Sequence, residues 1–357
     1  MSKVAILGFG VVGSGVAEVL HANAASIAAR APQPVSLQYV LDIRDFPDAP
    51  GAPAFVKDIH VILNDPEVDV VVETIGGTGA ALDYTRRALD AGKSVVTSNK
   101  EAVAEHGAEL QALAQRRGVN YLFEASVGGG IPIIRPLRQC LTANRLTSVC
   151  GILNGTTNYM LSHMAHQGLS FDQALTQAQA MGYAERDPSA DVDGTDAARK
   201  LAILATLAFG KTVTPGAIPT SGIRGVSGAD IAAAHAAGYA VKLLGRAECQ
   251  DGKTFALVAP HFVPRHSVLY PVDGVYNAIA VRGDAIGEVM FYGQGAGKLP
   301  TASAVVADII DALRHKANRS FLGILPEACA AVEPCGAPDT RPAALSGCCP
   351  EILMLPE

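Results

Sequence analysis

The feature that most constrains the fold is a glycine-rich segment near the N-terminus, Gly8-Phe-Gly10-Val-Val-Gly13. It follows an apolar run at residues 3–8 that is typical of a buried strand, and it opens a segment with helical character. In this setting Gly8 permits a tight turn, Gly10 lets a pyrophosphate approach the backbone, and Gly13 lets helix and strand pack closely. The helix N-terminus adds N–H donors and the positive end of its dipole. The segment therefore predicts a dinucleotide site, and the alternative is a tight turn without a ligand.

The first third of the chain alternates short apolar segments with helical ones. We expect strands at residues 3–8, 35–41, 68–73, 94–97 and 119–124, and helices at 13–29, 84–91 and 101–117. This alternation predicts an α/β fold with a Rossmann-type, doubly wound parallel sheet.

The pattern changes after a Gly-Gly-Gly-Ile-Pro stretch at 128–132. We expect strands at 147–153, 255–258, 277–281 and 288–292, and helices at 157–167, 171–182, 195–209 and 301–315, with Thr195 as an N-cap. The second domain is therefore α+β. The expected boundaries are 1–135 for the cofactor domain, completed by the helix at 301–315, then 136–300 for the second domain and 319–357 for a tail with cysteines and prolines.

Composition excludes several classes of protein. With 49% hydrophobic and 17% charged residues, the chain is not disordered. It has no uninterrupted apolar run of about 18 residues, so we expect no membrane partner. It has neither a Lys/Arg cluster nor many aromatic residues, so we expect no nucleic-acid partner. No secretory cleavage site follows the apolar start, and a cytoplasmic enzyme is expected.

Three polar residues follow strands at the predicted cofactor edge. Asp42 would bond the ribose 2′-OH of NAD, whereas Arg44 would favour the 2′-phosphate of NADP, so the preference stays open with a lean towards NAD. Lys100 could donate or shuttle a proton to a carbonyl oxygen near the nicotinamide. A surface lysine at a helix start is the alternative.

The densest polar signal lies at residues 182–200. Five carboxylates within twelve residues lead into a helix that is apolar on every face and therefore buried. Asp196 and Lys200 lie one helical turn apart on one face. Charges at the start of a buried helix are costly unless they are paired or used, which makes this a candidate site. The alternative is a capped helix with one exposed ion pair.

A glycine-rich turn, Glu124-Ala-Ser-Val-Gly-Gly-Gly-Ile-Pro132, could hold a hard monovalent cation through its carbonyls and the Glu124 carboxylate. A hinge between domains is an equally good interpretation. The loop Gly293-Gln-Gly-Ala-Gly-Lys298 fails the spacing of a Walker loop, and no motif supports hydrolase chemistry.

Together these segments resemble the homoserine dehydrogenase family over roughly residues 3–315. The resemblance rests on seven segments: GFGVVGSG at 8–15, VVETIGG at 71–77, TSNKEAVAEHG at 97–107, EASVGGGIPIIRPL at 124–137, GILNGTTNYML at 151–161, MGYAERDPSADVDGTDAARK at 181–200, and GQGAGKLPTASAVVADI at 293–309. The family interconverts L-homoserine and L-aspartate 4-semialdehyde with NAD(P), on the way to threonine, methionine and isoleucine.

The resemblance implies a role for each matched position. Lys100, Lys200 and Asp196 correspond to the catalytic groups, and Glu185 and Asp191 join Asp196 and Lys200 around the substrate. Cofactor-lining positions are Gly8, Gly10, Val11, Val12, Gly13, Asp42, Arg44, Thr74, Ser98 and Lys100. Sodium ligands would be Glu124 and the backbone carbonyls of Val127, Gly129 and Ile131. The second domain would bind substrate and form a homodimer.

Two other interpretations compete. One is a dehydrogenase of the same fold that acts on another amino-acid-derived alcohol, and the other is a nucleotide-binding sensor without catalysis. Many bacterial members carry a C-terminal ACT domain, and the roughly 40 residues after the last matched helix are too few for one, so a short form of the family is expected. Within the tail, Cys348 and Cys349 could crosslink subunits or respond to oxidant, with a divergent or disordered end as the alternative.

Overall fold

The computed structural model describes residues 1–316, 330–333, 343–345, 347–349 and 351–356. These residues form two compact units. The first contains the described part of 1–139 and 296–326, and the second contains that of 140–295 and 327–357.

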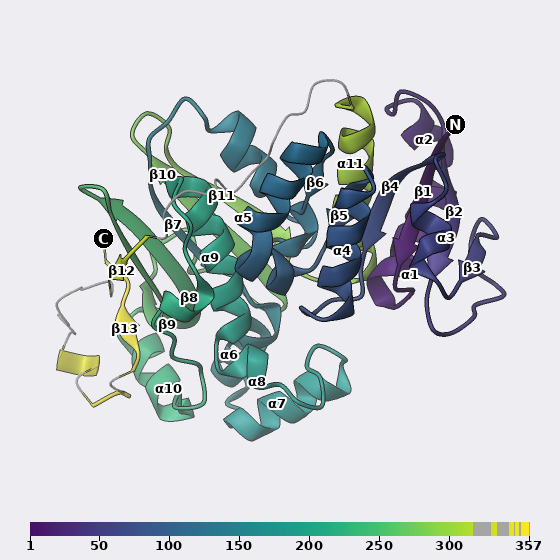
Figure 1. Ribbon diagram of the computed structural model, residues 1–357. Coiled ribbons are helices and arrows are strands. Elements are labelled where there is room, and N and C mark those ends of the chain that lie inside the picture. Colours follow the sequence, from purple (N-terminus) through teal and green to yellow (C-terminus); the bar gives the residue numbers. More distant parts are fainter. Residues whose placement is uncertain (317–329, 334–342, 346, 350, 357) are drawn as a thin grey trace. The chain divides into compact units, whose positions relative to one another are not determined.

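The first unit is built on a six-stranded sheet in which every pairing is parallel (Figure 1). Its strands are β1 (Ser2–Leu7), β2 (Val35–Leu41), β3 (Ala54–Val56), β4 (Val68–Glu73), β5 (Ser94–Thr97) and β6 (Tyr121–Leu122). The order β3-β2-β1-β4-β5-β6 reverses direction between β1 and β4, as in a Rossmann sheet. The expected fold class is confirmed.

Helices cover the sheet of the first unit. They are α1 (Val11–Ala22), α2 (Ala24–Ala28), α3 (Ile59–Leu63), α4 (Ala80–Asp90), α5 (Lys100–Arg117) and α11 (Lys298–Arg314). Helices α1 and α11 share one apolar core with alternate residues of β1, β2, β4 and β5. Helix α11 comes from the far end of the chain, so it completes a core that the first 139 residues begin.

Several elements of the first unit differ from their predictions: β3 and α3 were not predicted, and α4 begins at Ala80 rather than at residue 84. The helix expected at 13–29 divides at Asn23 into α1 and α2. The strand expected at 119–124 pairs only at Tyr121–Leu122, and Glu124 instead opens a 3₁₀ turn, Glu124–Ser126. Glu124 leaves the sheet because its backbone N–H donates to Asp308 of α11 at 2.8 Å rather than to a neighbouring strand.

The second unit contains a mixed sheet with the order β11-β10-β7-β8-β9-β12, and β13 also pairs with β9. Its strands are β7 (Leu146–Ile152), β8 (Tyr239–Gln250), β9 (Lys253–Pro264), β10 (Tyr276–Gly283), β11 (Gly287–Gln294), β12 (Val332–Glu333) and β13 (Leu353–Met354). We did not predict β8. Its buried Lys242 and Arg246 interrupt the apolar pattern, and they are tolerated because each pairs with an acid, Asp273 at 2.7 Å and Glu248 at 2.8 Å.

The helices of the second unit are α6 (Gly155–Gln167), α7 (Phe171–Ala180), α8 (Ser189–Val192), α9 (Thr195–Phe209) and α10 (Gly228–Ala236). Helix α7 opens with a capping box between Ser170 and Gln173. Helix α9 is buried along most of its length, as its all-round apolar pattern predicts. Its N-cap is Gly194 rather than Thr195, since the chain enters α9 from α8 through a left-handed residue with φ of +85°.

A loop and the chain's end cover part of this sheet. Leu269 and Val272 pack on Ile152, Leu244 and Ala278, and Leu355 joins the same cluster. The uncovered part of the face lines a cavity of about 630 Å³, bordered by Cys150, Arg246 and Arg282 among others. Within the tail, Cys348 is buried, and Cys329 and Cys335 lie outside the described residues.

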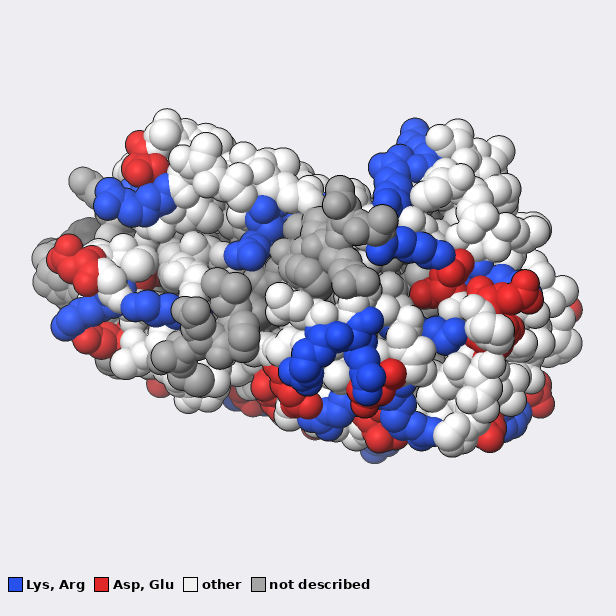
Figure 2. All heavy atoms as spheres, turned by 45° about the horizontal axis from the view of Figure 1, so that its top comes forward, with Lys and Arg blue, Asp and Glu red and all other residues white. Residues whose placement is uncertain are grey.

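On the face drawn in Figure 2, acidic and basic side chains are intermixed, and much of the described surface carries neither. Across the described ranges, no helix is long and apolar enough to cross a membrane.

Candidate functional site

The glycine segment forms a tight turn at the carboxyl end of β1. Gly8 has φ of +89°, a conformation that favours glycine. A Cβ on Gly13 would lie 2.1 Å from the Gly8 carbonyl oxygen, so only glycine fits there. Thr74, just after β4, donates its hydroxyl to the carbonyls of Leu7 and Gly8 at 3.1 and 2.8 Å. The expected residues Gly8, Gly13 and Thr74 therefore form one turn at the point where the strand order reverses.

The residues at the start of α1 provide no side-chain cap for the N-terminus of this helix. Gly10 is the N-cap, no side chain caps the helix, and Val11 is 67% exposed. The first turn, which includes Val12, carries no acidic residue. Its N–H groups therefore remain available to a phosphate, which the helix dipole also attracts.

Asp42 lies beside this turn. Its carboxylate accepts hydrogen bonds from the backbone N–H groups of Phe9 at 2.7 Å and Arg44 at 2.9 Å. Partial burial opposes ionisation, but these bonds and the Arg44 guanidinium outweigh it and lower the pKa of Asp42. The arrangement holds a charged carboxylate next to the glycine turn, with a largely exposed arginine side chain beside it.

Ser98 and Lys100 follow β5. Asn99 caps α5 by accepting from the N–H of Ala102 at 3.1 Å, which makes Lys100 the first residue of the helix. A residue that we did not predict organises this edge: buried Glu73 accepts from the Thr97 hydroxyl at 2.7 Å and from the N–H groups of Ile75 and Gly76 at 2.8 and 2.9 Å. The sequence feature that could have pointed to Glu73 is an acidic residue at the end of a buried strand.

In the second unit, the predicted Asp196–Lys200 pair is present and buried at the start of α9. The Lys200 ammonium lies 2.9 Å from Asp196 Oδ2 and donates to the Leu153 carbonyl at 2.8 Å. Both side chains are less than 10% exposed. This buried pair affects stability more than an exposed i,i+4 ion pair would, because the loss of one partner leaves an unpaired charge in the interior.

Asp191 joins the pair through a residue that we did not predict. The Asn154 amide donates to Asp191 at 2.7 Å and to Asp196 at 2.9 Å. Burial and the neighbouring Asp196 raise the pKa of Asp191, and hydrogen bonds from Asn154 and Thr156 act against that rise. Glu185 lies in the exposed loop between α7 and α8, outside this network in the described part of the chain. Asn154 lies between an expected strand and an expected helix, and this position could have indicated that it caps the helix. Nothing in the sequence indicated its contacts with the two acids.

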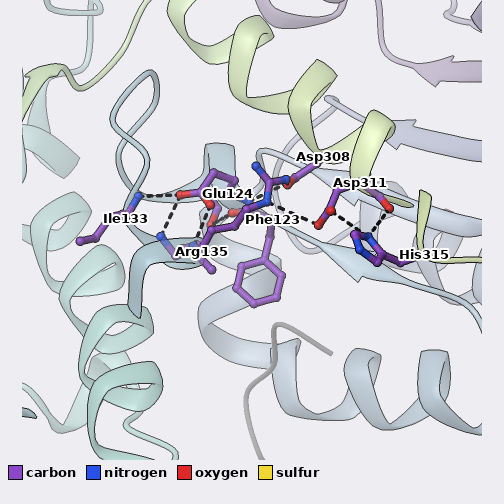
Figure 3. A network of polar contacts seen from close by, with 9 residues as sticks. Phe123, Glu124, Ile133, Arg135, Asp308, Asp311 and His315 are labelled. Atoms are coloured by element: carbon purple, nitrogen blue, oxygen red, sulfur yellow. Dashed lines mark hydrogen bonds and ion pairs between the residues drawn. The ribbon is translucent and has the colours of Figure 1, made fainter. Parts of the chain in front are cut away.

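The predicted sodium-binding turn belongs to the first unit. Figure 3 shows Glu124 with its carboxylate turned towards the backbone of the following segment. The carboxylate accepts from the N–H groups of Ile133, Ile134 and Arg135 at 2.7, 2.8 and 2.9 Å. The Arg135 guanidinium in turn contacts Asp308 and, at 3.4 Å, Asp311 of α11. The Glu124 charge is therefore already solvated by three amides.

Asp308 is fully buried in this cluster. Burial and the nearby acids raise its pKa to about 7, against the attraction of Arg135. We call Glu124, Arg135, Asp308 and Asp311 the first acidic cluster, and Asn154, Asp191, Asp196 and Lys200 the second.

The conformation of this turn depends on two glycines. A Cβ on Gly128 would lie 2.4 Å from the Ile131 carbonyl oxygen, and Gly129 has φ of +56°, a conformation that favours glycine. In the described ranges, no group of three His, Cys, Asp or Glu side chains forms a metal site.

Comparisons with known proteins identify the family. A family model described as homoserine dehydrogenase matches residues 132–310, and one described as homoserine dehydrogenase, NAD binding domain, matches residues 8–124. The chain belongs to the homoserine dehydrogenase family. It is therefore an NAD(P)-dependent oxidoreductase that acts on a CH–OH group, and the expected resemblance and enzyme class are confirmed.

Relatives and solved structures agree. A homoserine dehydrogenase of Neisseria gonorrhoeae is 45% identical over 315 residues, which cover 87% of this chain and 72% of the relative. A homoserine dehydrogenase structure from Thiobacillus denitrificans has a TM-score of 0.88 at 41% identity, covering 93% of this chain and 79% of that one. A hyperthermophilic archaeal homoserine dehydrogenase in complex with NADPH has a TM-score of 0.73 at 27% identity, covering 87% of this chain and 97% of that one.

Proposed function

We propose that the second acidic cluster carries the oxidation of L-homoserine to L-aspartate 4-semialdehyde and its reverse, within threonine, methionine and isoleucine synthesis. The observation that supports this most is the buried Asp196–Lys200 pair with Asp191 beside it. In the oxidation, Lys200 as the neutral amine takes the hydroxyl proton and becomes an ammonium group, which Asp196 orients; in the reverse reaction this ammonium returns the proton. Asp191, with Glu185 from the exposed loop, binds the cationic amino group of the substrate.

NAD(P), held by residues of the first unit, would supply the hydride-accepting group for the reaction. In the proposed arrangement, Gly8, Gly10 and Gly13 and the N-terminus of α1 bind its pyrophosphate, while Val11, Val12, Thr74 and Ser98 line its path. Lys100 is proposed as the second proton-carrying lysine. Asp42 binds the ribose. Its ionised carboxylate, which the Phe9 N–H holds in place, favours NAD, whereas Arg44 would bind the 2′-phosphate of NADP.

The test is an assay with L-homoserine at alkaline pH and each cofactor in turn. We expect the absorbance of reduced nicotinamide to rise, with higher kcat/KM for NAD. Arg44→Ala should leave the NAD value within threefold, and a selective loss with NADP would assign the 2′-phosphate to Arg44. Absence of any signal with both cofactors would overturn the proposed reaction.

We also propose sodium at the glycine-rich turn, held by the carbonyls of Val127, Gly129 and Ile131 with Glu124 supplying negative charge behind them. The cation would fix the turn and take no chemical part. Replacing sodium by choline at constant ionic strength should lower the melting temperature by a few degrees. An unchanged melting temperature across the titration would remove the proposal.

A homodimer is proposed through the uncovered face of the second sheet, where Met290 and Tyr292 of β11 are 39% and 53% exposed. Sedimentation should give twice the chain mass, and Met290→Glu should shift the species towards one chain. A monomer at micromolar concentration would rule this out. We place the enzyme in the cytoplasm, and fractionation of cells that produce it should recover the activity there.

A further inference from the structure

Asn154 occupies the junction between β7 and α6. It is 5% exposed, and its side-chain carbonyl accepts from the Thr157 N–H at 2.9 Å and the Thr157 hydroxyl at 3.0 Å. It is therefore the N-cap of α6. These two donors also fix the orientation of the amide, because a flipped amide would direct its NH₂ group at the Thr157 N–H.

The NH₂ group consequently faces the second acidic cluster. An amide nitrogen carries two hydrogens, and here one goes to Asp191 and the other to Asp196, at 2.7 and 2.9 Å. One short side chain thus bridges two carboxylates that would otherwise repel one another in a largely buried setting. A helix cap alone would need only the carbonyl half of the residue.

The preceding residue belongs to the same arrangement. The Leu153 carbonyl accepts from the Lys200 ammonium at 2.8 Å, while Lys200 also contacts Asp196. Residues 153 and 154 therefore fix the cation and both acids from a single strand end. Because that strand end is capped into α6, a shift of the junction would move all three charged groups together.

We propose that Asn154 is a positioning residue for the dehydrogenase reaction, which holds the side chains of Asp191 and Asp196 correctly oriented around Lys200. This rests on the proposed function of the cluster. The acids bind the amino group and orient the lysine, and Asn154 acts through them without touching the reacting atoms. In the described part of the chain, the groups that face the two carboxylates include Asn154, Thr156 and Lys200, and the carboxylates also face one another.

Two variants separate this role from capping. Asn154→Asp keeps the shape and the capping carbonyl but replaces the two donors by a third carboxylate. We expect its kcat/KM for homoserine to fall at least 100-fold, with the acid limb of the pH–rate profile moved to higher pH, because three acids now share one lysine. Asn154→Ser keeps a good N-cap but cannot bridge both acids. We expect it to lose at least tenfold in kcat at an unchanged melting temperature.

Thr157→Ala is the matched control, since it removes a hydroxyl from the capping side of Asn154 without altering the carboxylate side. Its kinetics should stay within threefold of the wild type. The proposal fails if the wild-type enzyme oxidises homoserine while Asn154→Ser retains full kcat, or if Thr157→Ala loses as much activity as Asn154→Ser. A wild-type enzyme inactive with homoserine and both cofactors would instead overturn the proposed function beneath it.

Discussion

Both acidic clusters contain carboxylates and one cationic side chain, but the groups that hold the carboxylates differ between the two clusters. In the first, Glu124 receives three backbone N–H groups, and Arg135 contacts both remaining acids. In the second, the acids contact side chains: Asn154 donates to both, Lys200 contacts Asp196, and Thr156 hydrogen-bonds Asp191. Backbone amides cannot move without moving the fold, whereas a lysine and an amide can exchange partners. The comparison indicates that the first cluster fixes structure and the second is available for chemistry.

The largest expected effect is on catalysis at the second cluster. Lys200→Ala removes the proposed proton carrier, so kcat should fall by about 10³-fold, within the range for general acid–base catalysis. Cofactor affinity, measured by the fluorescence of reduced nicotinamide, should stay unchanged. A loss below tenfold would show that Lys200 carries no proton, and the contrast between the clusters would disappear.

The first cluster should respond in stability. Arg135→Met removes the cation that contacts Asp308 and Asp311, while Asp311 keeps its contact with His315 at 2.8 Å. Breaking a buried pair costs about 3–5 kcal/mol, so we expect the free energy of unfolding to fall by up to that amount. Urea unfolding followed by circular dichroism measures the free energy of unfolding. Arg145→Met is the control, because that side chain is 82% exposed beside Asp284 and should change the same quantity by less than about 0.5 kcal/mol. Equal losses in the two variants would contradict the structural role.

Acid should act on the second unit through a group outside both clusters. Burial lowers the pKa of His261 to about 4, with its Nδ1 near the Ala259 carbonyl. In the unfolded chain His261 is protonated below about pH 6.5, whereas in the folded chain it stays neutral down to about pH 4. The free energy of unfolding therefore falls as the pH falls from 6.5 to 4. The contribution is about 3 kcal/mol. His261→Gln should flatten this part of the unfolding curve, and an unchanged slope would place the acid sensitivity elsewhere.

The strands β1, β2, β4 and β5 could be predicted closely because the strands of a parallel sheet are runs of apolar residues, whereas the short and partly exposed edge strand β3 was missed. The contact between Asp196 and Lys200 also followed from spacing, since residues four apart share a helix face. The strand β8 could not be predicted, because two buried charges interrupt its apolar pattern: Lys242 pairs with Asp273, which is distant in sequence, and Arg246 pairs with Glu248 on the same strand. Asn154 and Glu73 were missed for the same reason: their partners are assembled only by tertiary structure.

The membership of α11 in the first unit bears on how the chain is made. The core of that unit includes Val305, Ile309 and Leu313, which leave the ribosome after the whole second sheet up to β11. The first unit therefore cannot finish folding when only residues 1–139 have been synthesised. The side of its core that α11 covers stays exposed while about 160 further residues are made. At about 5–20 residues synthesised per second this lasts roughly ten seconds or more. Nascent chains stalled before and after residue 314 should differ sharply in protease resistance of the N-terminal segment.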